Sequence, residues 1–347
     1  MSYLQAFVIA LIQGVTELFP ISSLGHSVLV PAWIGGSWQT LVTQSSEPNS
    51  ESSFYLSYIV ALHCATALAL MWFFRADWVR VIRGFIRSLS RSLRQRRLAV
   101  ADTDERLAWM IVFATIPVGL TGVVLEHTFR TVFAKPVAAG AFLFVNGLIL
   151  AGAEILSRSR ARRRPPSSVR EVNQAPVMAR AAPARVTTEL PEATSRPHSH
   201  RKTTGGRARA EIDAVRQSDH RITALSYLDA VVIGGFQIAA LLAGISRSGI
   251  TIAGGLWRGL DHEDAARFAF LLATPVILAA GVLKVPSLLG PSGAHIHGQV
   301  ALGVVVTAVS AYLSVRFLVR WFQTRTLTPF AVYCLVAGAV SVAHFMS

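Results

Sequence analysis

Residues 21–26, Ile-Ser-Ser-Leu-Gly-His, and residues 245–249, Ile-Ser-Arg-Ser-Gly, place polar side chains and glycines inside two segments otherwise apolar enough to lie in a bilayer. Such polar groups are costly in hydrocarbon unless they face a cavity or one another. Breaks of this kind at corresponding places in two halves of a membrane chain are typical of a binding site between internal repeats. We therefore expect the functional site where the two stretches meet.

The two stretches belong to an internal repeat. Shifting the chain by 224 positions aligns residues 6–33 with residues 230–257, and nine of these 28 positions are identical. Among the identical pairs are Gln13 with Gln237, Ser22 with Ser246 and Gly25 with Gly249. Because the polar break interrupts each apolar run, we predict two re-entrant helical hairpins, at 4–34 and 226–260, instead of two through-going helices.

The composition indicates a membrane protein, with 52% hydrophobic and only 15% charged residues. A helix of ~20 apolar residues crosses the ~30 Å hydrocarbon core of a bilayer. Runs of about this length predict an all-α, polytopic fold with six transmembrane helices, at 54–74, 107–126, 136–156, 268–285, 298–315 and 327–346.

The positions of Lys and Arg predict the orientation, because these residues collect in cytoplasmic loops. Four regions hold 29 of the 33 basic residues: 75–106, 157–223, 258–267 and 316–326. Six spans and two hairpins place all four regions on the cytoplasmic side of the plasma membrane. Three spans separate the hairpins, so the first enters from outside and the second from the cytoplasm, which makes an inverted-topology repeat.

The segment 157–223 divides the two repeats, which are 1–156 and 224–347. It is rich in Arg, Pro, Ala, Ser and Thr and poor in large apolar residues, so it is predicted to be a disordered, basic cytoplasmic insert. The net charge of +14 follows the topology and fits a surface that faces anionic membrane lipid. We do not expect a nucleic acid partner.

The first hairpin carries candidate catalytic groups. Gln13 and Glu17 are four residues apart and share a helix face, which Pro20 ends. A second helix after this turn would bring Ser23 and His26 toward Glu17, which supplies a nucleophile, a base and a carboxylate. Alternatively, Ser22 or Ser23 only caps that helix and His26 is a hydrogen-bonded interior residue.

The second hairpin carries a candidate anion site. Arg247 is the only basic residue between 222 and 257, and its planar guanidinium matches phosphate or carboxylate. Hydroxyl and backbone N–H groups around it could complete the site, with Ser246, Ser248, Gly249 and Thr251 as the candidates. The alternative is an internal ion pair with Glu17 and no ligand.

Two long motifs resemble those of the undecaprenyl pyrophosphate phosphatases, an integral membrane family associated with bacitracin resistance. The motifs are residues 13–26, Gln-Gly-Val-Thr-Glu-Leu-Phe-Pro-Ile-Ser-Ser-Leu-Gly-His, and residues 244–251, Gly-Ile-Ser-Arg-Ser-Gly-Ile-Thr. Further similarity lies at 114–117 and 268–275. The resemblance implies hydrolysis of undecaprenyl diphosphate to undecaprenyl phosphate and inorganic phosphate, which recycles the carrier for cell-wall synthesis at the outer face of the membrane.

The resemblance also implies roles for the residues that match the motifs. Ser23 matches the proposed nucleophile, His26 a nearby base or acid, and Glu17 an essential carboxylate. Arg247 matches the phosphate-binding arginine, flanked by the hydroxyls of Ser246, Ser248 and Thr251. Ser22, Gly249 and Gln13 fall beside these positions and are expected to help bind the phosphates. The family is divalent-cation dependent, which implies Mg²⁺ or Ca²⁺, held with Glu17 through the bound diphosphate.

Three positions depart from the family pattern, which often has glutamate at Gln13, a hydroxyl residue at Leu24 and proline at Ala243. Inverted repeats with broken helices are also a transporter design, so a membrane transporter or polyprenyl-phosphate flippase is the main alternative. A structural membrane protein, in which the two buried charges only neutralise each other, is a third. The oligomeric state is left open between a monomer and a homodimer.

Overall fold

The computed structural model describes residues 1–45, 54–133, 135–163, 204–288 and 297–347, and these are all-helical apart from short connections. The helices of the first half are α1 Tyr3–Thr16, α2 Ser23–Ile34, α3 Gly36–Ser45, α4 Phe54–Phe73, α5 Arg75–Gln95, α6 Thr103–Phe133 and α7 Pro136–Arg163. Those that follow are α9 Thr204–Thr223, α10 Tyr227–Phe236, η3 Gln237–Leu241, α11 Arg247–Trp257, α12 His262–Leu288, α13 His297–Thr324 and α14 Thr328–Met346.

The chain is a multi-pass membrane protein. Among the described residues, four helices are long and apolar enough to cross a membrane, namely α7, α12, α13 and α14, or up to six if each of two bent helix pairs is one span. The bent pairs are α4 with α5, at 87°, and α9 with α10, at 93°. Each of the six predicted spans falls on one helix to within a residue.

The helices of the two hairpins begin at corresponding positions, offset by 224 residues. α1 begins at Tyr3 and α10 at Tyr227, and each is preceded by a serine in a capping box, Ser2 or Ser226. α2 begins at Ser23 and α11 at Arg247, after a cap by Ser22 or Ser246. The repeat seen in the sequence is therefore a repeat of local structure.

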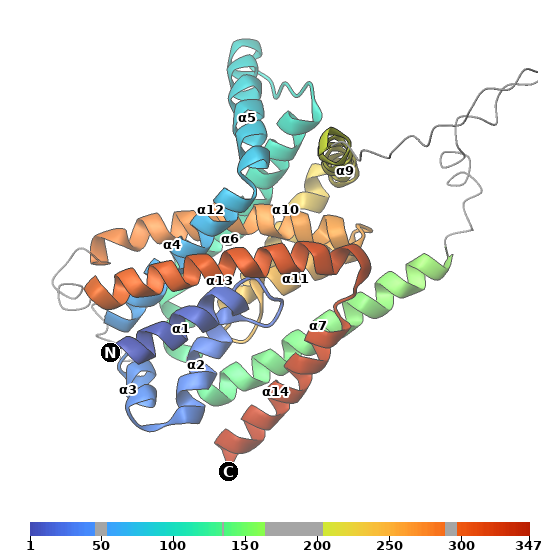
Figure 1. Cartoon of the computed structure of the whole chain (residues 1–347). Coiled ribbons are helices and arrows are strands. Elements are labelled where there is room, and N and C mark those ends of the chain that lie inside the picture. Colours follow the sequence, from blue (N-terminus) through green and yellow to red (C-terminus); the bar gives the residue numbers. More distant parts are fainter. Residues whose placement is uncertain (46–53, 134, 164–203, 289–296) are drawn as a thin grey trace, which may run out of the picture.

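The helices pack through small residues. α7 lies beside α14, whereas α4, α12 and α13 pack together on the other side of the hairpins (Figure 1). α10 packs on α6 at Gly234, where an added Cβ would lie 1.8 Å from the carbonyl oxygen of Ala114. Close backbone approach at small residues is how membrane helices associate, since lipid supplies no hydrophobic drive between them.

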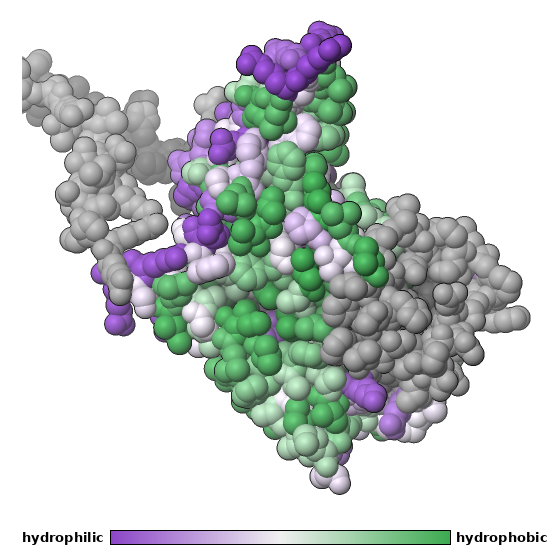
Figure 2. Space-filling view, turned by 180° about the vertical axis from the view of Figure 1, so that it is seen from behind, coloured by the Kyte–Doolittle hydropathy of each residue, from purple (hydrophilic) through white to green (hydrophobic). Residues whose placement is uncertain are grey.

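α5 projects from the bundle (Figure 1). It presents apolar residues and arginines on different faces, with Ile82 and Ile86 exposed on the apolar one. Seen from behind, the body of the molecule is largely hydrophobic, and hydrophilic residues gather at the tip of this projection (Figure 2). A hydrophobic body of this kind suits lipid contact.

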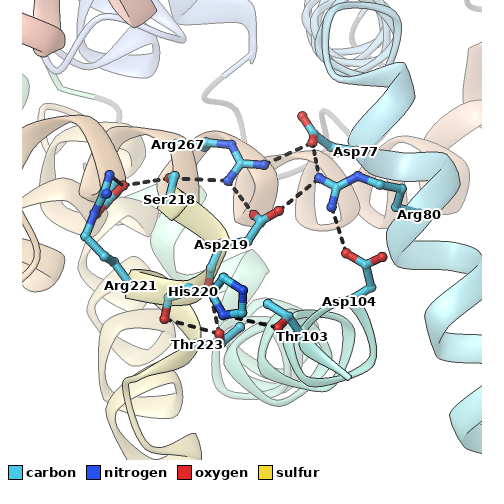
Figure 3. Close-up of polar contacts among 11 residues, drawn as sticks. Asp77, Arg80, Thr103, Asp104, Ser218, Asp219, His220, Arg221, Thr223 and Arg267 are labelled. Atoms are coloured by element: carbon cyan, nitrogen blue, oxygen red, sulfur yellow. Dashed lines mark hydrogen bonds and ion pairs between the residues drawn. The ribbon is translucent and has the colours of Figure 1, made fainter. Parts of the chain in front are cut away.

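Ion pairs join α5, α6, α9 and α12 at the base of the projection (Figure 3). Arg80 contacts Asp104 at 2.7 Å and Asp219 at 3.0 Å. Arg267 contacts Asp219 at 2.5 Å and Asp77 at 3.0 Å. Asp219 is 1% exposed and Arg267 is 8% exposed, so the end of α9 is built into the protein.

The predicted disorder of 157–223 is therefore wrong at both ends. α7 continues to Arg163, and residues 204–223 form α9. Composition predicts disorder when a segment has little apolar surface to bury, but here α9 is held by buried polar contacts to other helices. Residues 164–203 lie outside the described part of the chain.

Candidate active site

The first hairpin breaks between α1 and α2 in a way that places one serine at the start of α2 and strains the serine before it. Glu17 caps the end of α1, and Pro20 follows. Ser22 has φ +72°, a region that non-glycine residues rarely adopt, and its hydroxyl oxygen accepts a hydrogen bond from the N–H of Gly25. Ser23 is consequently the first residue of α2, at the positive end of the helix dipole.

The second hairpin repeats this arrangement around Arg247. Gly244 has φ +118°, and a Cβ at this position would lie 2.5 Å from the carbonyl oxygen of Ala139, so only glycine fits. The hydroxyl oxygen of Ser246 accepts from the N–H of Gly249 at 3.1 Å and caps α11. Arg247 is the first residue of α11.

Each capping serine also bonds to the other hairpin. The hydroxyl of Ser22 accepts from the N–H of Gly244 at 3.2 Å. The hydroxyl of Ser246 donates to the carbonyl oxygen of Phe19 at 3.3 Å, and that of Ser248 donates to the same oxygen at 3.2 Å. These bonds join the two breaks into one structure.

Asn146 of α7 bridges the two breaks and was not singled out from the sequence. Its Nδ2 donates to the carbonyl oxygen of Pro20 at 3.0 Å, and its Oδ1 accepts from the N–H of Ser246 at 3.1 Å. A fully buried asparagine in an apolar span needs such partners. A polar side chain within the predicted span 136–156 was the sequence signal that could have singled out Asn146.

Glu17 lies at the centre of the joined hairpins and is 6% exposed. Its Oε2 accepts from Gln13 Nε2 at 3.0 Å and from the hydroxyl of Ser23. Arg247 Nη2 lies 3.8 Å from the other carboxylate oxygen, Oε1. The structure therefore brings the candidate nucleophile and carboxylate of the first hairpin together with the candidate guanidinium of the second.

The imidazole beside Glu17 is His63 of α4, and the expectation that His26 takes this place is corrected. His63 Nε2 lies 3.2 Å from Glu17 Oε2, and its Nδ1 donates to the carbonyl oxygen of Ile59. The ring nitrogens of His26 have other partners, the carbonyl oxygen of Ser22 and the hydroxyl of Tyr333, each at 2.7 Å. His26 thus fits the alternative of a hydrogen-bonded interior residue.

The hairpins enclose a small pocket whose lining includes five of the ten predicted site residues. It is lined by Glu17, Ser22, Ser23, Leu24, Ala240, Ile245, Ser246 and Arg247. The hydroxyl of Thr251 donates to the carbonyl oxygen of Arg247, and Ser248 bonds within the joined hairpins. Thr251, Ser248 and Gly249 therefore shape the loop and do not line the pocket.

Comparison with known proteins identifies the family. The family model described as "Bacitracin resistance protein BacA" matches residues 6–179 and 203–340. The undecaprenyl-diphosphatase 2 of Frankia alni is 56% identical, over 99% of this chain and 98% of that protein. The undecaprenyl-diphosphatase of Mycolicibacterium paratuberculosis is 51% identical, over 99% and 97%, respectively.

This chain belongs to the BacA family. The resemblance inferred from the two motifs is thereby confirmed, and it extends over nearly the whole chain. An undecaprenyl-diphosphatase of Gluconacetobacter diazotrophicus is more distant, at 38% identity over 98% of this chain and 96% of that protein.

The electrostatics of this BacA-family site favour an anion. α2 and α11 both begin at the pocket, and helix N-termini bind anions through their free N–H groups. Among the described residues, Arg247 Nη1 is buried without a hydrogen-bond partner. An unpartnered buried guanidinium nitrogen is costly, so it favours a ligand that accepts a hydrogen bond.

The site of this BacA-family chain also has oxygen atoms that suit a hard cation. Gln13 Oε1 is buried and without a hydrogen-bond partner in the described part of the chain, and it belongs to the residue that donates to Glu17. Mg²⁺ and Ca²⁺ bind amide and carboxylate oxygens. No three His, Cys, Asp or Glu side chains cluster closely enough among the described residues to hold a metal ion by themselves. Oxygen atoms of a bound diphosphate would have to complete such a site.

Proposed function

We propose that this chain hydrolyses undecaprenyl diphosphate to undecaprenyl phosphate and inorganic phosphate, and so contributes to bacitracin resistance and cell-wall synthesis. The observation that carries the proposal is the hydrogen bond from Ser23 to Glu17 beside the buried, unpartnered Nη1 of Arg247. The relatives' shared name, undecaprenyl-diphosphatase, supports this substrate.

The geometry supports nucleophilic attack by Ser23. Its Oγ forms a bond to the terminal phosphorus, its proton passes to Glu17, and the bond from that phosphorus to the bridging oxygen breaks. Undecaprenyl phosphate leaves, and a water molecule then cleaves the phosphoserine to release inorganic phosphate. Arg247 and the N–H groups at the starts of α2 and α11 stabilise the charge that develops on the phosphoryl oxygens.

The remaining candidates have supporting roles in this proposal. Gln13 Oε1 and Glu17 would hold Mg²⁺ or Ca²⁺ together with the diphosphate, and the cation would neutralise phosphate charge. Ser22, Ser246, Ser248, Gly249 and Thr251 fix the shape of the two helix starts. His26 positions the Ser22 carbonyl from behind the pocket.

The proposed arrangement in the membrane follows from the arginine distribution. The halves 1–156 and 224–347 form an inverted repeat, the insert 157–223 lies in the cytoplasm, and the pocket opens to the outer side of the plasma membrane. The prenyl chain stays in hydrocarbon while the head group enters the pocket. A homodimer, if formed, would carry one such pocket in each copy.

Phosphate release from undecaprenyl diphosphate by the purified, reconstituted protein tests the proposal. We expect Glu17→Gln and Ser23→Ala to lower the rate by about 10³-fold or more, with Ser159→Ala, an exposed serine of α7, as the matched control. A normal rate in Ser23→Ala would replace the covalent route with attack by water. Retention of full activity in Glu17→Gln would remove this site, and uptake of the lipid without phosphate release would favour a transporter.

A further inference from the structure

The end of α13 forms a second cavity, which the proposed reaction does not use. This cavity is an open groove of about 450 Å³. Its lining includes three arginines, Arg316, Arg320 and Arg325, and three apolar residues, Leu313, Phe317 and Trp321. We call it the arginine groove.

The charge of the arginine groove is not balanced by the protein. None of its lining residues is acidic, and within the described part of the chain none of its three arginines forms an ion pair. Arg325 lies over the ring of Trp321, 5.8 Å from its centroid. Three like charges within about three helical turns repel one another, so the groove favours an anion.

An exposed apolar stripe on the same helix runs into the groove. It consists of Val305, Val309, Leu313 and Phe317, which are 62%, 56%, 57% and 47% exposed. Residues four apart lie on one face of a helix, and α13 is long and apolar enough to span the membrane. A hydrocarbon-facing stripe that ends in a cationic groove matches a molecule with an apolar chain and an anionic head group.

We propose that the arginine groove binds the phosphate head group of an anionic glycerophospholipid of the inner leaflet, with an acyl chain along the apolar stripe. Guanidinium groups bind phosphate through paired N–H donors, and basic pockets at cytoplasmic helix ends bind anionic lipid head groups. The proposal depends on the membrane orientation given above and is independent of the hydrolysis reaction.

The groove also lies close to the first hairpin. The ring of Phe317 stacks on that of Phe19, with 5.8 Å between centroids, and the carbonyl oxygen of Phe19 accepts from Ser246 and Ser248. A lipid bound there would lie against the packing that supports the joined hairpins. It would do so without touching any residue of the catalytic pocket.

Native mass spectrometry of the full chain, released from nanodiscs that contain phosphatidylglycerol and phosphatidylcholine, tests the proposal. A variant with Arg316→Gln, Arg320→Gln and Arg325→Gln is compared with a control carrying Arg83→Gln, Arg94→Gln and Arg216→Gln. The control removes the same charge from exposed arginines on the same predicted side. Only the groove variant loses guanidinium hydrogen bonds to the phosphate, and one hydrogen bond to a charged group gives roughly a tenfold gain in affinity. The groove variant should therefore bind phosphatidylglycerol at least about tenfold more weakly than the control.

Competition distinguishes the sources of the phosphate group. Short-chain phosphatidylglycerol should displace the bound lipid, whereas glycerol phosphate and short-chain phosphatidylcholine should not. Leu313→Ser should weaken retention of phosphatidylglycerol while the protein stays monomeric or dimeric as before. Phosphate release should be unchanged in the groove variant, which separates this result from the hydrolysis proposal.

Three results would overturn the proposal. Equal retention of phosphatidylglycerol by the groove variant and the control would show that the basic surface attracts anionic lipid without a specific site in the groove. Displacement by glycerol phosphate as effective as by the lipid would show a site for free anions. A dimer lost in Leu313→Ser would show that a second copy of the chain covers the stripe.

Discussion

Ser23 and Arg247 occupy the same position in the two copies of the hairpin, as the first residue of the helix that follows the break. Both stand beside Glu17, with Ser23 donating to Oε2 and Arg247 Nη2 3.8 Å from Oε1. In the proposed reaction, the repeat thus places the nucleophile in one copy and the phosphate-binding group in the other. The divergence at a single equivalent position makes the site asymmetric.

Substitution of Arg247 by Ala or Lys should show whether activity depends on the positive charge alone or also on the paired N–H donors of the guanidinium. We expect Arg247→Ala to lower the kcat for phosphate release by ~10²–10³-fold, as for loss of one preorganised donor at the reacting group. Arg247→Lys should keep part of the activity, because the charge remains while the paired donors are lost. Equal activity of the two variants would show that no directed hydrogen bond is needed.

Substitution of His63 should test its contact with Glu17. His63→Leu removes the Nε2 contact at 3.2 Å, and we expect it to lower kcat by about tenfold or more with a smaller effect on KM. His63→Gln retains an N–H donor and should recover part of the rate. His26→Gln is the comparison, since the ring nitrogens of His26 bond to Ser22 and Tyr333 and not to Glu17 or Ser23 in the described part of the chain. A larger loss in His26→Gln than in His63→Leu would reverse this assignment.

Substitution of Gly244 should destabilise the joined hairpins. In Gly244→Ala the new Cβ would lie 2.5 Å from the carbonyl oxygen of Ala139, and the residue would keep φ +118° at a strain of about 1–3 kcal/mol. Gly35→Ala is a matched control, because it also has positive φ but nothing within 4 Å of the added Cβ. We expect a lower Tm for both and a much lower Tm for Gly244→Ala. Equal Tm values would mean that the backbone relaxes around the clash.

Substitution of Asp219 should release the end of α9. Asp219→Asn removes one charged partner from Arg267 and one from Arg80, while both keep their contacts with Asp77. Breaking a buried pair costs up to about 3–5 kcal/mol. We expect faster cleavage by trypsin within α9 and a lower Tm. Asp213→Asn, an exposed position on the same helix, should change neither. An unchanged cleavage rate in Asp219→Asn would show that other contacts hold α9.

Part of the segment 157–223 is ordered although its composition predicts disorder. Composition alone assigned 157–223 to disorder, because its few apolar side chains cannot drive burial. α9 nevertheless forms, since Asp219 and Ser218 find partners on other helices. Deletion of only 164–203 should preserve phosphate release, because the contacts of Ser218 and Asp219 lie outside that segment.

The sequence by itself determined the positions of the six predicted spans, the two interrupted helical segments, their repeat and the residues at each break. Apolar run length, capping serines and proline act locally, so these features can be identified without knowing the tertiary contacts. Only the tertiary structure decided that His63 instead of His26 faces Glu17, and that Asn146 joins the two breaks. Those contacts depend on how separate helices pack, which local sequence patterns do not encode.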